Sequence, residues 1–289
     1  MRVSGFTFIR NGTMLGYPFV ESIVSALPLC DEFVVAVGLS EDDTLARVQA
    51  IADPKIRILS TQWNEQMRAT GHVYAQQTMI AQFNCTGDWA LYLQCDEVLH
   101  EDDLGAIGES MKRHQGDPRV EALVFDYYHF FGSPDWIAVS PGWYRREVRI
   151  IRNTIRSYSP SDGLFFVVMD RNKRGRYPRA ALADGTIHHY GHVRSPAKMQ
   201  AKIQKVSRYW GHEPPPFTHY AIDPSALRPF SSRHPAVMRR WLAEEAAQCY
   251  EPDPSHVPSR RERRHRLMMH VEDWLGVDLT RKHFKLVHG

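Results

Sequence analysis

Cysteine is scarce in this sequence and forms no motif. The four cysteines stand far apart and make no CxxC pair: Cys30, Cys85, Cys95 and Cys249. Structural zinc sites and disulfide frameworks need clustered or regularly spaced cysteines, so this spacing argues against both. We expect reduced thiols, as in a protein of the cytoplasm.

Long apolar segments are missing as well. The first residues, MRVSGFTFIRN, contain no apolar core long enough for a signal peptide, and no uncharged apolar run reaches the length that crosses a bilayer. No internal repeat or low-complexity segment is present. With 43% hydrophobic residues and a formal net charge of +3, the 289-residue chain has the composition of a folded globular protein. The weak positive charge and the lack of a recognised RNA-binding motif argue against a nucleic-acid partner.

Strand and helix patterns alternate through the first hundred residues. The strand patterns occupy Val3–Ile9, Glu32–Gly38, 55–60 and 88–94. The helical patterns occupy 16–27, 41–51 and 71–84. This order predicts an α/β fold with a mostly parallel sheet and helices on both faces. In such sheets, ligands bind beyond the carboxyl ends of the strands.

The rest of the chain has a different character. Aromatic and basic strand patterns precede a helix that we expect from Ser195, its N-cap, to about Gly211. A proline-rich break, HEPPPF, follows, and from about Pro235 the sequence is helical and basic. We expect one domain over residues 1–211, with halves at about 1–104 and 105–211. Residues 212–289 are expected to form a helical C-terminal extension.

One strand pattern ends in a cluster of acids, in LYLQCDEVLHEDDL at residues 91–104. Glu101, Asp102 and Asp103 suit the first turn of a helix, where the helix dipole favours acids. Asp96 and Glu97 precede that turn and directly follow the strand. Carboxylates in this position are hard oxygen ligands, which predicts a site for Mg²⁺ or Mn²⁺.

Several segments have a recognisable order. They are FIRNG (8–12), VGLSEDDT (37–44), GHVYAQQT (71–78), DWALYLQCDEVL (88–99), SYSPSDGLF (157–165) and TIHHYGHVRSP (186–196). Together they resemble family 2 nucleotide-sugar glycosyltransferases, and the last two resemble a bacterial subgroup. The resemblance implies the Rossmann-like GT-A fold. It also implies transfer of a sugar from a nucleotide-sugar donor to a glycan, lipid-linked or small-molecule acceptor, as in cell-envelope polysaccharide assembly.

The resemblance also implies a donor site. Its nucleotide-binding residues would be Phe8, Ile9, Arg10, Asn11, Gln77, Gln94 and Cys95. Asp96 matches the last aspartate of the DxD motif and would hold Mn²⁺ or Mg²⁺, with His189 and Glu97 as further ligands. Gln94 replaces the first DxD aspartate, and Val37 or Gly38 replaces the usual nucleotide-binding aspartate. The donor nucleotide therefore stays open.

Diphosphate binding needs cationic or N–H donors near the metal. Arg194 and Lys198 stand at the expected start of a helix, which suits an anion. Lys202 lies one helical turn beyond Lys198 and is more simply explained as part of a solvated face.

An inverting transfer also needs a base near the acceptor hydroxyl. The resemblance places Asp162 there, while a turn aspartate that bonds its own backbone is the alternative for SDG. Glu147 is the second candidate for the base. Its alternative role is an ordinary ion pair with its neighbours Arg145, Arg146 and Arg149.

The C-terminal segment raises a separate question. SRRERRHR precedes a helical pattern in which Leu267, Val271, Trp274 and Leu275 share one face. This stripe either docks on the rest of the protein or contacts an anionic membrane, with the arginines on headgroups. The second alternative would place a cytoplasmic enzyme at the inner face of the membrane.

Two rival functions remain. A sugar nucleotidyltransferase has the same architecture, but FIRNGTML lacks the repeated glycines of that class. A non-catalytic protein that binds nucleotides or anions is the other rival.

Overall fold

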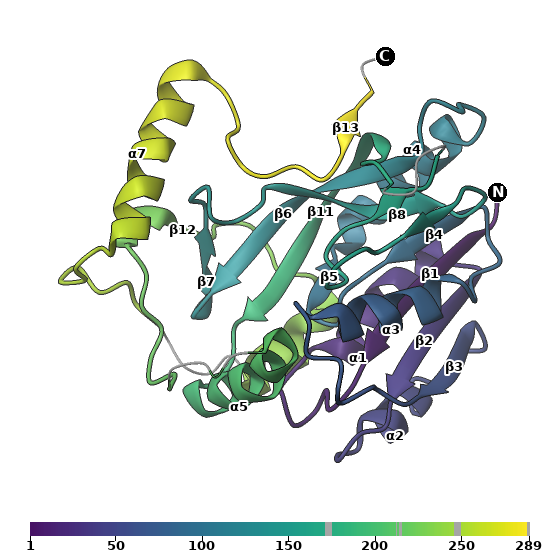
Figure 1. Cartoon of the computed structure of the whole chain (residues 1–289), viewed down its shortest axis with the longest axis horizontal. Helices are drawn as coiled ribbons and strands as arrows, with labels where there is room; N and C mark the ends of the chain where they lie inside the picture. The colour runs from purple at the N-terminus through teal and green to yellow at the C-terminus, as the bar shows by residue number, and fades with distance from the viewer. Residues whose placement is uncertain (171–174, 212, 214–215, 246–249, 288–289) are drawn as a thin grey trace.

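The fold is built on one twisted sheet (Figure 1). The structure is a computed structural model that describes residues 1–170, 175–211, 213, 216–245 and 250–287. The strands of the 11-stranded sheet are β1 (Val3–Ile9), β2 (Glu32–Gly38), β3 (Ile56–Thr61), β4 (Trp89–Tyr92), β5 (Glu97–Leu99), β6 (Ala122–Phe131), β7 (Ser133–Ala138), β8 (Arg146–Arg152), β11 (Arg179–His192), β12 (Leu227–Pro229) and β13 (Lys285–Leu286). A separate small sheet pairs β9 (Ser157–Tyr158) with β10 (Val167–Val168).

Helices connect these strands. The α-helices are α1 (Phe19–Ala26), α2 (Thr44–Gln49), α3 (His72–Gln82), α4 (Leu104–His114), α5 (Pro196–Ser207), α6 (Arg239–Glu245) and α7 (Arg260–Leu275). The 3₁₀ helices are η1 (Leu27–Leu29), η2 (Glu101–Asp103), η3 (Arg208–Trp210), η4 (Pro224–Ala226) and η5 (Ala236–Met238). As predicted, Ser195 caps α5, and its side chain accepts the N–H of Lys198.

The N-terminal half of the sheet is parallel. β1 lies between β2 and β4, and β3 pairs with β2 on the far side. β2, with the sequence EFVVAVG, is buried along nearly its whole length. Burial of every position is expected for a parallel strand that helices cover on both faces.

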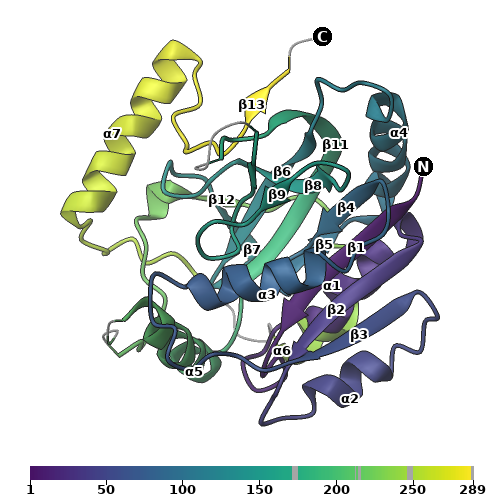
Figure 2. The same ribbon diagram turned by 45° about the vertical axis from the view of Figure 1, so that its right-hand side comes forward.

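The two faces of this half carry different helices. Val3 and Ile9 of β1 pack in the same apolar cluster as α1 and α4, whereas Phe6 packs in the cluster that includes α3. Figure 2 shows α3 lying across one face of the sheet. The predicted α/β fold with a mostly parallel sheet and helices on both faces is confirmed.

Beyond β4 the sheet becomes mixed. β8 pairs antiparallel with β4 and with β6, while the long strand β11 runs parallel to β6. The other edge of β11 pairs with β5, which sets His189 opposite Glu97. This pairing brings together the two segments that the sequence predicts as metal-binding.

The C-terminal segment returns to the sheet. β12 pairs with β7, and β13 pairs with β11. Met238 and Trp241 pack against Tyr190 of β11. Helix α7 lies at the margin of the molecule (Figure 1). The segment after residue 211 therefore contains α6, α7 and two short strands that join the sheet.

The structure bears on the cysteines and on membrane-spanning helices. Cys30, Cys85 and Cys95 carry free thiols, and Cys249 lies outside the described residues. Within the described ranges, no helix combines the length and the apolar composition needed to cross a bilayer.

Candidate functional site

A cavity of about 270 Å³ opens beyond the carboxyl ends of β1 and β4. Polar side chains from separate segments line it: Gln94, Cys95, Asp96, Asp162, His189 and Lys202. Aromatic and apolar side chains complete the wall: Phe8, Tyr17, Tyr74, Leu164, Val206 and Trp210. Candidate residues that are distant in the sequence thus meet where ligands bind in parallel α/β sheets.

Asp96 lies in the turn between β4 and β5 and is 6% exposed. Its Oδ1 is 3.7 Å from Nε2 of His189, and its Oδ2 is 3.4 Å from Nζ of Lys202. Burial by itself would raise the pKa of Asp96, but the nearby cations Lys202 and Arg194 outweigh burial and hold the pKa well below its ordinary value. Asp96 is therefore an ionised carboxylate, with a cation at one oxygen and an imidazole facing the other.

A chain of hydrogen bonds orients His189. Nε2 of His129 lies 2.7 Å from the carbonyl oxygen of Tyr144, which can only accept, so that nitrogen carries the proton. Burial lowers the pKa values of both His129 and His189, so both rings are neutral at pH 7. Nδ1 of His129 then accepts from Nδ1 of His189, at 2.9 Å. Nε2 of His189 is left with its lone pair facing Asp96, which is the tautomer that a metal ligand requires.

Two cationic side chains lie near Asp96: Arg194 is buried, and Lys202 is 18% exposed. Lys202 and Arg194 both lie over the ring of Tyr17, at 5.0 and 4.7 Å from its centroid. Burial and the charge of Arg194 lower the pKa of Lys202 to about 8. Arg194 is 1% exposed, and its Nε and Nη2 have no hydrogen-bond partner in the part of the chain that the structure describes. Lys202 and Arg194 together offset the carboxylates of Asp96 and Asp162 and supply cationic donors for an anionic ligand.

The position of Lys202 differs from the sequence prediction of a solvated residue. Its Nζ donates to the carbonyl oxygen of Gly191 at 2.8 Å and lines the cavity. A Cβ on Gly191 would overlap the imidazole of His189 and lie 3.1 Å from Oδ2 of Asp96. Glycine is therefore needed here for the close approach of β11 to the site.

Glu97 has a structural role. It is fully buried, and Arg149 of β8 donates to both of its oxygens at 2.7 Å. Tyr127 donates to Oε1, and the backbone N–H of Gln94 donates to Oε2, each at 3.0 Å. Because these four hydrogen bonds occupy both of its oxygens, Glu97 has no free lone pair for a metal ion. Instead it fixes the turn that carries Asp96.

Asp162 lies in a turn at the wall of the cavity. Its Oδ1 accepts the N–H of Leu164 at 3.2 Å, which is the self-bonding turn that the sequence left as the alternative. The carbonyl oxygen of Gly163 accepts from the side chain of Gln94 at 3.3 Å, and that of Leu164 accepts from Arg149 at 2.9 Å. Asp162 thus stabilises its own turn and also lines the cavity, so the two roles are compatible.

Glu147 lies away from this cavity. It is fully buried in β8, and its Oε2 is 2.6 Å from Nδ1 of His283. The predicted ion pair with its neighbouring arginines is wrong, because they pair with other carboxylates: Arg145 with Glu272, Arg146 with Asp126 and Arg149 with Glu97.

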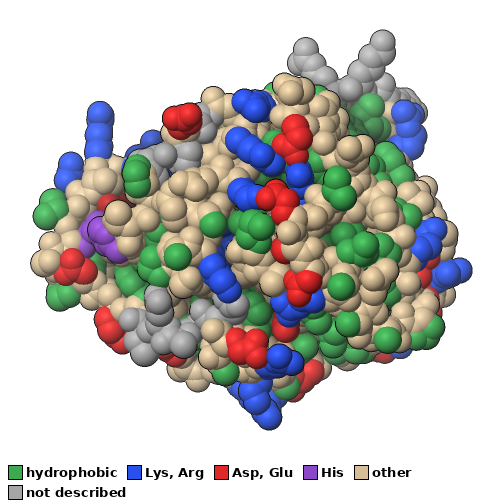
Figure 3. All heavy atoms as spheres, turned by 90° about the horizontal axis from the view of Figure 1, so that it is seen from below, with side chains coloured by type: hydrophobic (Ala, Val, Ile, Leu, Met, Phe, Trp, Pro, Cys, Tyr) green, Lys and Arg blue, Asp and Glu red, His purple; other side chains and the backbone are tan. Residues whose placement is uncertain are grey.

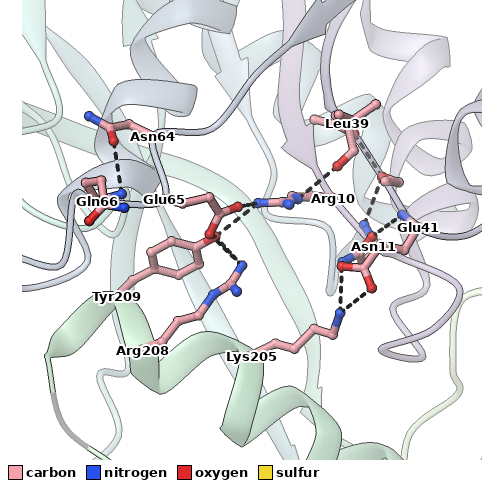
Figure 4. Close-up of polar contacts among 12 residues, drawn as sticks. Arg10, Asn11, Leu39, Glu41, Asn64, Glu65, Gln66, Lys205, Arg208 and Tyr209 are labelled. Carbon is pink, nitrogen blue, oxygen red and sulfur yellow. Dashed lines mark hydrogen bonds and ion pairs between the residues drawn. The ribbon is translucent and has the colours of Figure 1, made fainter.

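Helix α5 and η3 close over the segment that follows β1 (Figure 4). Arg10 pairs with Glu65 and lies 3.1 Å from Oη of Tyr209, while Lys205 pairs with Glu41 at 2.8 Å. Figure 3 shows Lys, Arg, Asp and Glu side chains interspersed over the face seen from below. A second cavity of about 50 Å³ adjoins these contacts, and its lining includes the predicted residues Phe8, Ile9, Arg10, Asn11 and Cys95.

Other predicted residues lie outside both cavities. Gln77 is buried in α3, and Lys198 lies in the first turn of α5. Glu101 and Asp102 belong to η2, as the sequence predicts, and together with His100 they form the one group of three potential metal ligands in the described residues. Glu101 and Asp102 are exposed, His100 is buried, and none of the three lines the cavity.

Two residues that shape the site were not identified from the sequence as functional. Arg149 holds both candidate segments, and His129 orients His189. The sequence feature that could have identified them is a polar residue within an apolar strand pattern. A polar side chain that is buried in this way requires a partner.

The chain was compared with known proteins. No family model and no curated protein matches it. Solved structures with partial likeness include S. aureus TarS in complex with UDP-GlcNAc, glucosyl-3-phosphoglycerate synthase from Mycobacterium tuberculosis in complex with Mn²⁺, UDP and glucosyl-3-phosphoglycerate, and mannosyl-3-phosphoglycerate synthase from Rubrobacter xylanophilus. Their identities are 15%, 16% and 20%, with TM-scores of 0.35, 0.31 and 0.32. The matches cover 56%, 45% and 45% of this chain and 49%, 45% and 41% of those chains, so this chain spans about half their length or less. Likeness at this level assigns no ligand and no reaction to this chain.

Proposed function

We propose that this protein is a nucleotide-sugar glycosyltransferase of the GT-A type, with its donor site at Asp96. The observation that carries the proposal is that Asp96, His189, Asp162 and Lys202 line one cavity at the carboxyl ends of the sheet. Together they offer a carboxylate and an imidazole for a divalent cation, an ammonium group for a diphosphate, and a second carboxylate for an acceptor hydroxyl. A sugar transfer from a nucleoside diphosphate needs these groups. The sequence resemblance to family 2 enzymes supports the same assignment.

The residues present fit a divalent cation. Oδ1 of Asp96 and Nε2 of His189 face each other, and the hydrogen bond from His189 to His129 leaves that Nε2 unprotonated. A carboxylate and a neutral imidazole suit Mn²⁺, or Mg²⁺ with more water, completed by diphosphate oxygens. When bound, the cation supplies Lewis-acid stabilisation of the leaving diphosphate.

In the proposed reaction, the chain's own groups move one proton and neutralise one leaving group. Asp162 accepts the proton of the acceptor hydroxyl as its oxygen forms a bond to the anomeric carbon. The bond between that carbon and the diphosphate breaks, and the electron pair leaves with the diphosphate. Lys202 and Arg194 neutralise that charge. Attack opposite to the leaving group gives inversion.

The donor's nucleoside would occupy the smaller cavity lined by Arg10, Asn11 and Cys95. At about 50 Å³ this cavity is much smaller than ordinary ligand pockets, which measure roughly 300–1,000 Å³. Donor binding therefore requires two ion pairs beside this cavity to break, Lys205–Glu41 and Arg10–Glu65. The catalytic unit in this proposal is residues 1–211. The acceptor is a glycan, lipid-linked or small-molecule hydroxyl in the cytoplasm.

The first experiment tests donor binding. Thermal denaturation is followed with UDP, GDP, ADP, CDP and dTDP, each with and without Mn²⁺. We expect one of them to raise the melting temperature in a Mn²⁺-dependent manner, since a ligand that binds only the folded state stabilises it. Asp96→Asn should remove the Mn²⁺-dependent part, and His189→Gln should weaken it. If no nucleoside diphosphate stabilises the protein, or if Asp96→Asn keeps the full effect, the proposal is wrong.

The second experiment tests the base. With the donor identified, release of its nucleoside diphosphate is measured by mass spectrometry. Asp162→Asn should keep donor affinity and lose turnover by a factor on the order of 10²–10⁴. The matched control is Asp253→Asn, because Asp253 makes the same self-bonding turn, with Ser255, on the surface. Equal rates in the two variants would remove Asp162 from the mechanism.

A further inference from the structure

Helix α7 presents apolar side chains to solvent. Leu267, Trp274 and Leu275 are 64%, 83% and 53% exposed. Their spacing of i, i+7 and i+8 places them on one face of the helix. The sequence left open whether this stripe docks on the rest of the protein, and in the structure these three side chains point away from it. Large apolar side chains gathered on one exposed face indicate a surface that binds something.

The face of α7 that meets the rest of the protein is polar. Glu272 is 5% exposed, and its oxygens accept from Arg145 at 3.0 and 2.6 Å. Arg266 donates to both oxygens of Asp223 at 3.0 and 2.8 Å, and Glu262 accepts the N–H of Asp223 at 2.9 Å. A cavity of about 400 Å³ lies among these residues. Ion pairs therefore attach α7 with its apolar side outward, the reverse of ordinary amphipathic docking.

Three arginines share the apolar face. They stand seven, four and three positions before Leu267, so they project on the same side, and all are exposed: Arg260, Arg263 and Arg264. The carboxylates of α7 lie elsewhere, because Glu262 and Glu272 face the rest of the protein and Asp273 projects about 120° away from Leu267. The outward face of α7 is thus both cationic and apolar, with no carboxylate among its side chains.

We propose that this face of α7 docks on an anionic lipid surface. The arginines would lie at the phosphate and serine headgroups, and Trp274 with its apolar neighbours would enter the interface. A bilayer fits this face better than a protein does, because the face is the convex side of one helix at the margin of the molecule (Figure 1). A protein partner would need a groove matched to that helix, whereas a membrane interface accepts its whole length. The proposal does not depend on the reaction proposed above.

Vesicle sedimentation tests this proposal with the full chain. The probes are vesicles of phosphatidylcholine alone and of phosphatidylcholine with 30% phosphatidylserine, at low and at physiological salt. We expect sedimentation with the anionic vesicles, no sedimentation with the neutral ones, and weaker binding as salt rises. Absence of sedimentation with anionic vesicles at low salt would overturn the proposal, as would equal binding to neutral vesicles.

Variants with a matched control locate the surface. Changing the three arginines to Glu should reduce binding to anionic vesicles on the order of 100-fold or more. The control reverses three exposed cations on and after α4, which changes the net charge equally: Lys112, Arg113 and Arg119. It should bind as the unmodified protein does. Equal loss in both triple variants would show that net charge alone drives binding and would overturn the assignment to α7.

Depth of insertion gives a second measurement. Trp274→Ser should weaken binding to anionic vesicles, whereas Phe83→Ser, which removes a 66% exposed apolar side chain from the end of α3, should not. Brominated lipids should quench part of the tryptophan fluorescence of the unmodified protein. This quenching should be absent in Trp274→Phe. Unchanged binding by Trp274→Ser together with unchanged quenching in Trp274→Phe would overturn insertion of this face.

Discussion

Replacing Arg149 with methionine should destabilise the protein strongly, although Arg149 touches no ligand in the proposed mechanism. Arg149 and Glu97 are both fully buried, and two hydrogen bonds of 2.7 Å join them. Burial opposes the charge of Arg149, but the Glu97 carboxylate outweighs this and raises the pKa of Arg149 well above its ordinary value. Arg149 is therefore charged at all ordinary pH values, and removing either member of the pair leaves the other buried without its partner.

The magnitude follows from that burial. Removing one partner of a buried ion pair costs about 3–5 kcal/mol of the free energy of unfolding. For a chain of this size, that loss lowers the melting temperature on the order of 10 °C. Glu97→Gln should cost a similar amount. The double variant should be more stable than the sum of the two losses predicts, by about 2–3 kcal/mol, because it leaves no unpaired buried charge.

Urea denaturation of the metal-free protein measures these free energies. The matched control is Arg146→Met, three residues earlier in β8, where Arg146 pairs with Asp126 on the surface. A surface pair of this kind contributes about 1 kcal/mol or less. If Arg149→Met were no more destabilising than Arg146→Met, the structural role of the pair would be refuted. If Glu97→Gln lost Mn²⁺ binding but kept its metal-free stability, Glu97 would have to return to the list of metal ligands.

Two further predictions concern the cavity. Because burial and Arg194 lower the pKa of Lys202 to about 8, Lys202 is cationic below that pH and neutral above it. Affinity for the nucleoside diphosphate, measured by calorimetry without metal, should fall as pH rises through about 8. Lys202→Met should remove this step, and a step of equal size in that variant would contradict the assignment. For the second, His129→Phe should weaken Mn²⁺ binding about 10- to 100-fold, because His189 loses the acceptor that sets its tautomer. The control is His100→Phe, whose ring lies beside His188 instead, and equal affinities in the two variants would refute the relay.

Local signals in the sequence predicted much of the fold. β1 and β2 have the predicted bounds, because each is a run of strand length rich in β-branched and aromatic residues, and polar or turn residues flank it. The cap of α5 at Ser195 was predicted for a similar reason, since a serine followed by proline is a local signal for a helix start. None of these features depends on distant parts of the chain.

The separate roles of Asp96 and Glu97 could not be predicted in this way. The two carboxylates are adjacent in the sequence, and both follow the same strand. After β4 the chain turns and enters β5, so Asp96 faces the cavity while Glu97 faces β8. The partner of Glu97 stands 52 residues later and is brought to it by the pairing of β8 with β4. A single sequence shows the apolar pattern of each strand, but it does not show which strands lie side by side in the fold.

Helix α7 shows the same limit. Its spacing predicts that Leu267, Trp274 and Leu275 share a face, but not which way that face points. The direction is decided by Arg145 and Asp223, which lie in loops of other parts of the chain and bind the opposite side of the helix. Polar contacts between segments distant in the sequence therefore determine which way the apolar face of α7 points, and the apolar periodicity does not.

The contact between Glu147 and His283 has a consequence for how the protein is made. The two residues are 136 positions apart, and Glu147 is fully buried in β8 at the centre of the sheet. During synthesis β4, β6 and β8 leave the ribosome long before residue 283 does. Until then, a carboxylate in the sheet interior lacks its partner, which opposes tight closure of that region. The edge of β11 that will pair with β13 is open for the same period. The nascent chain can therefore form its parallel half early, but the half that carries Asp162 and His189 reaches its final packing only after residues 283–286 have emerged.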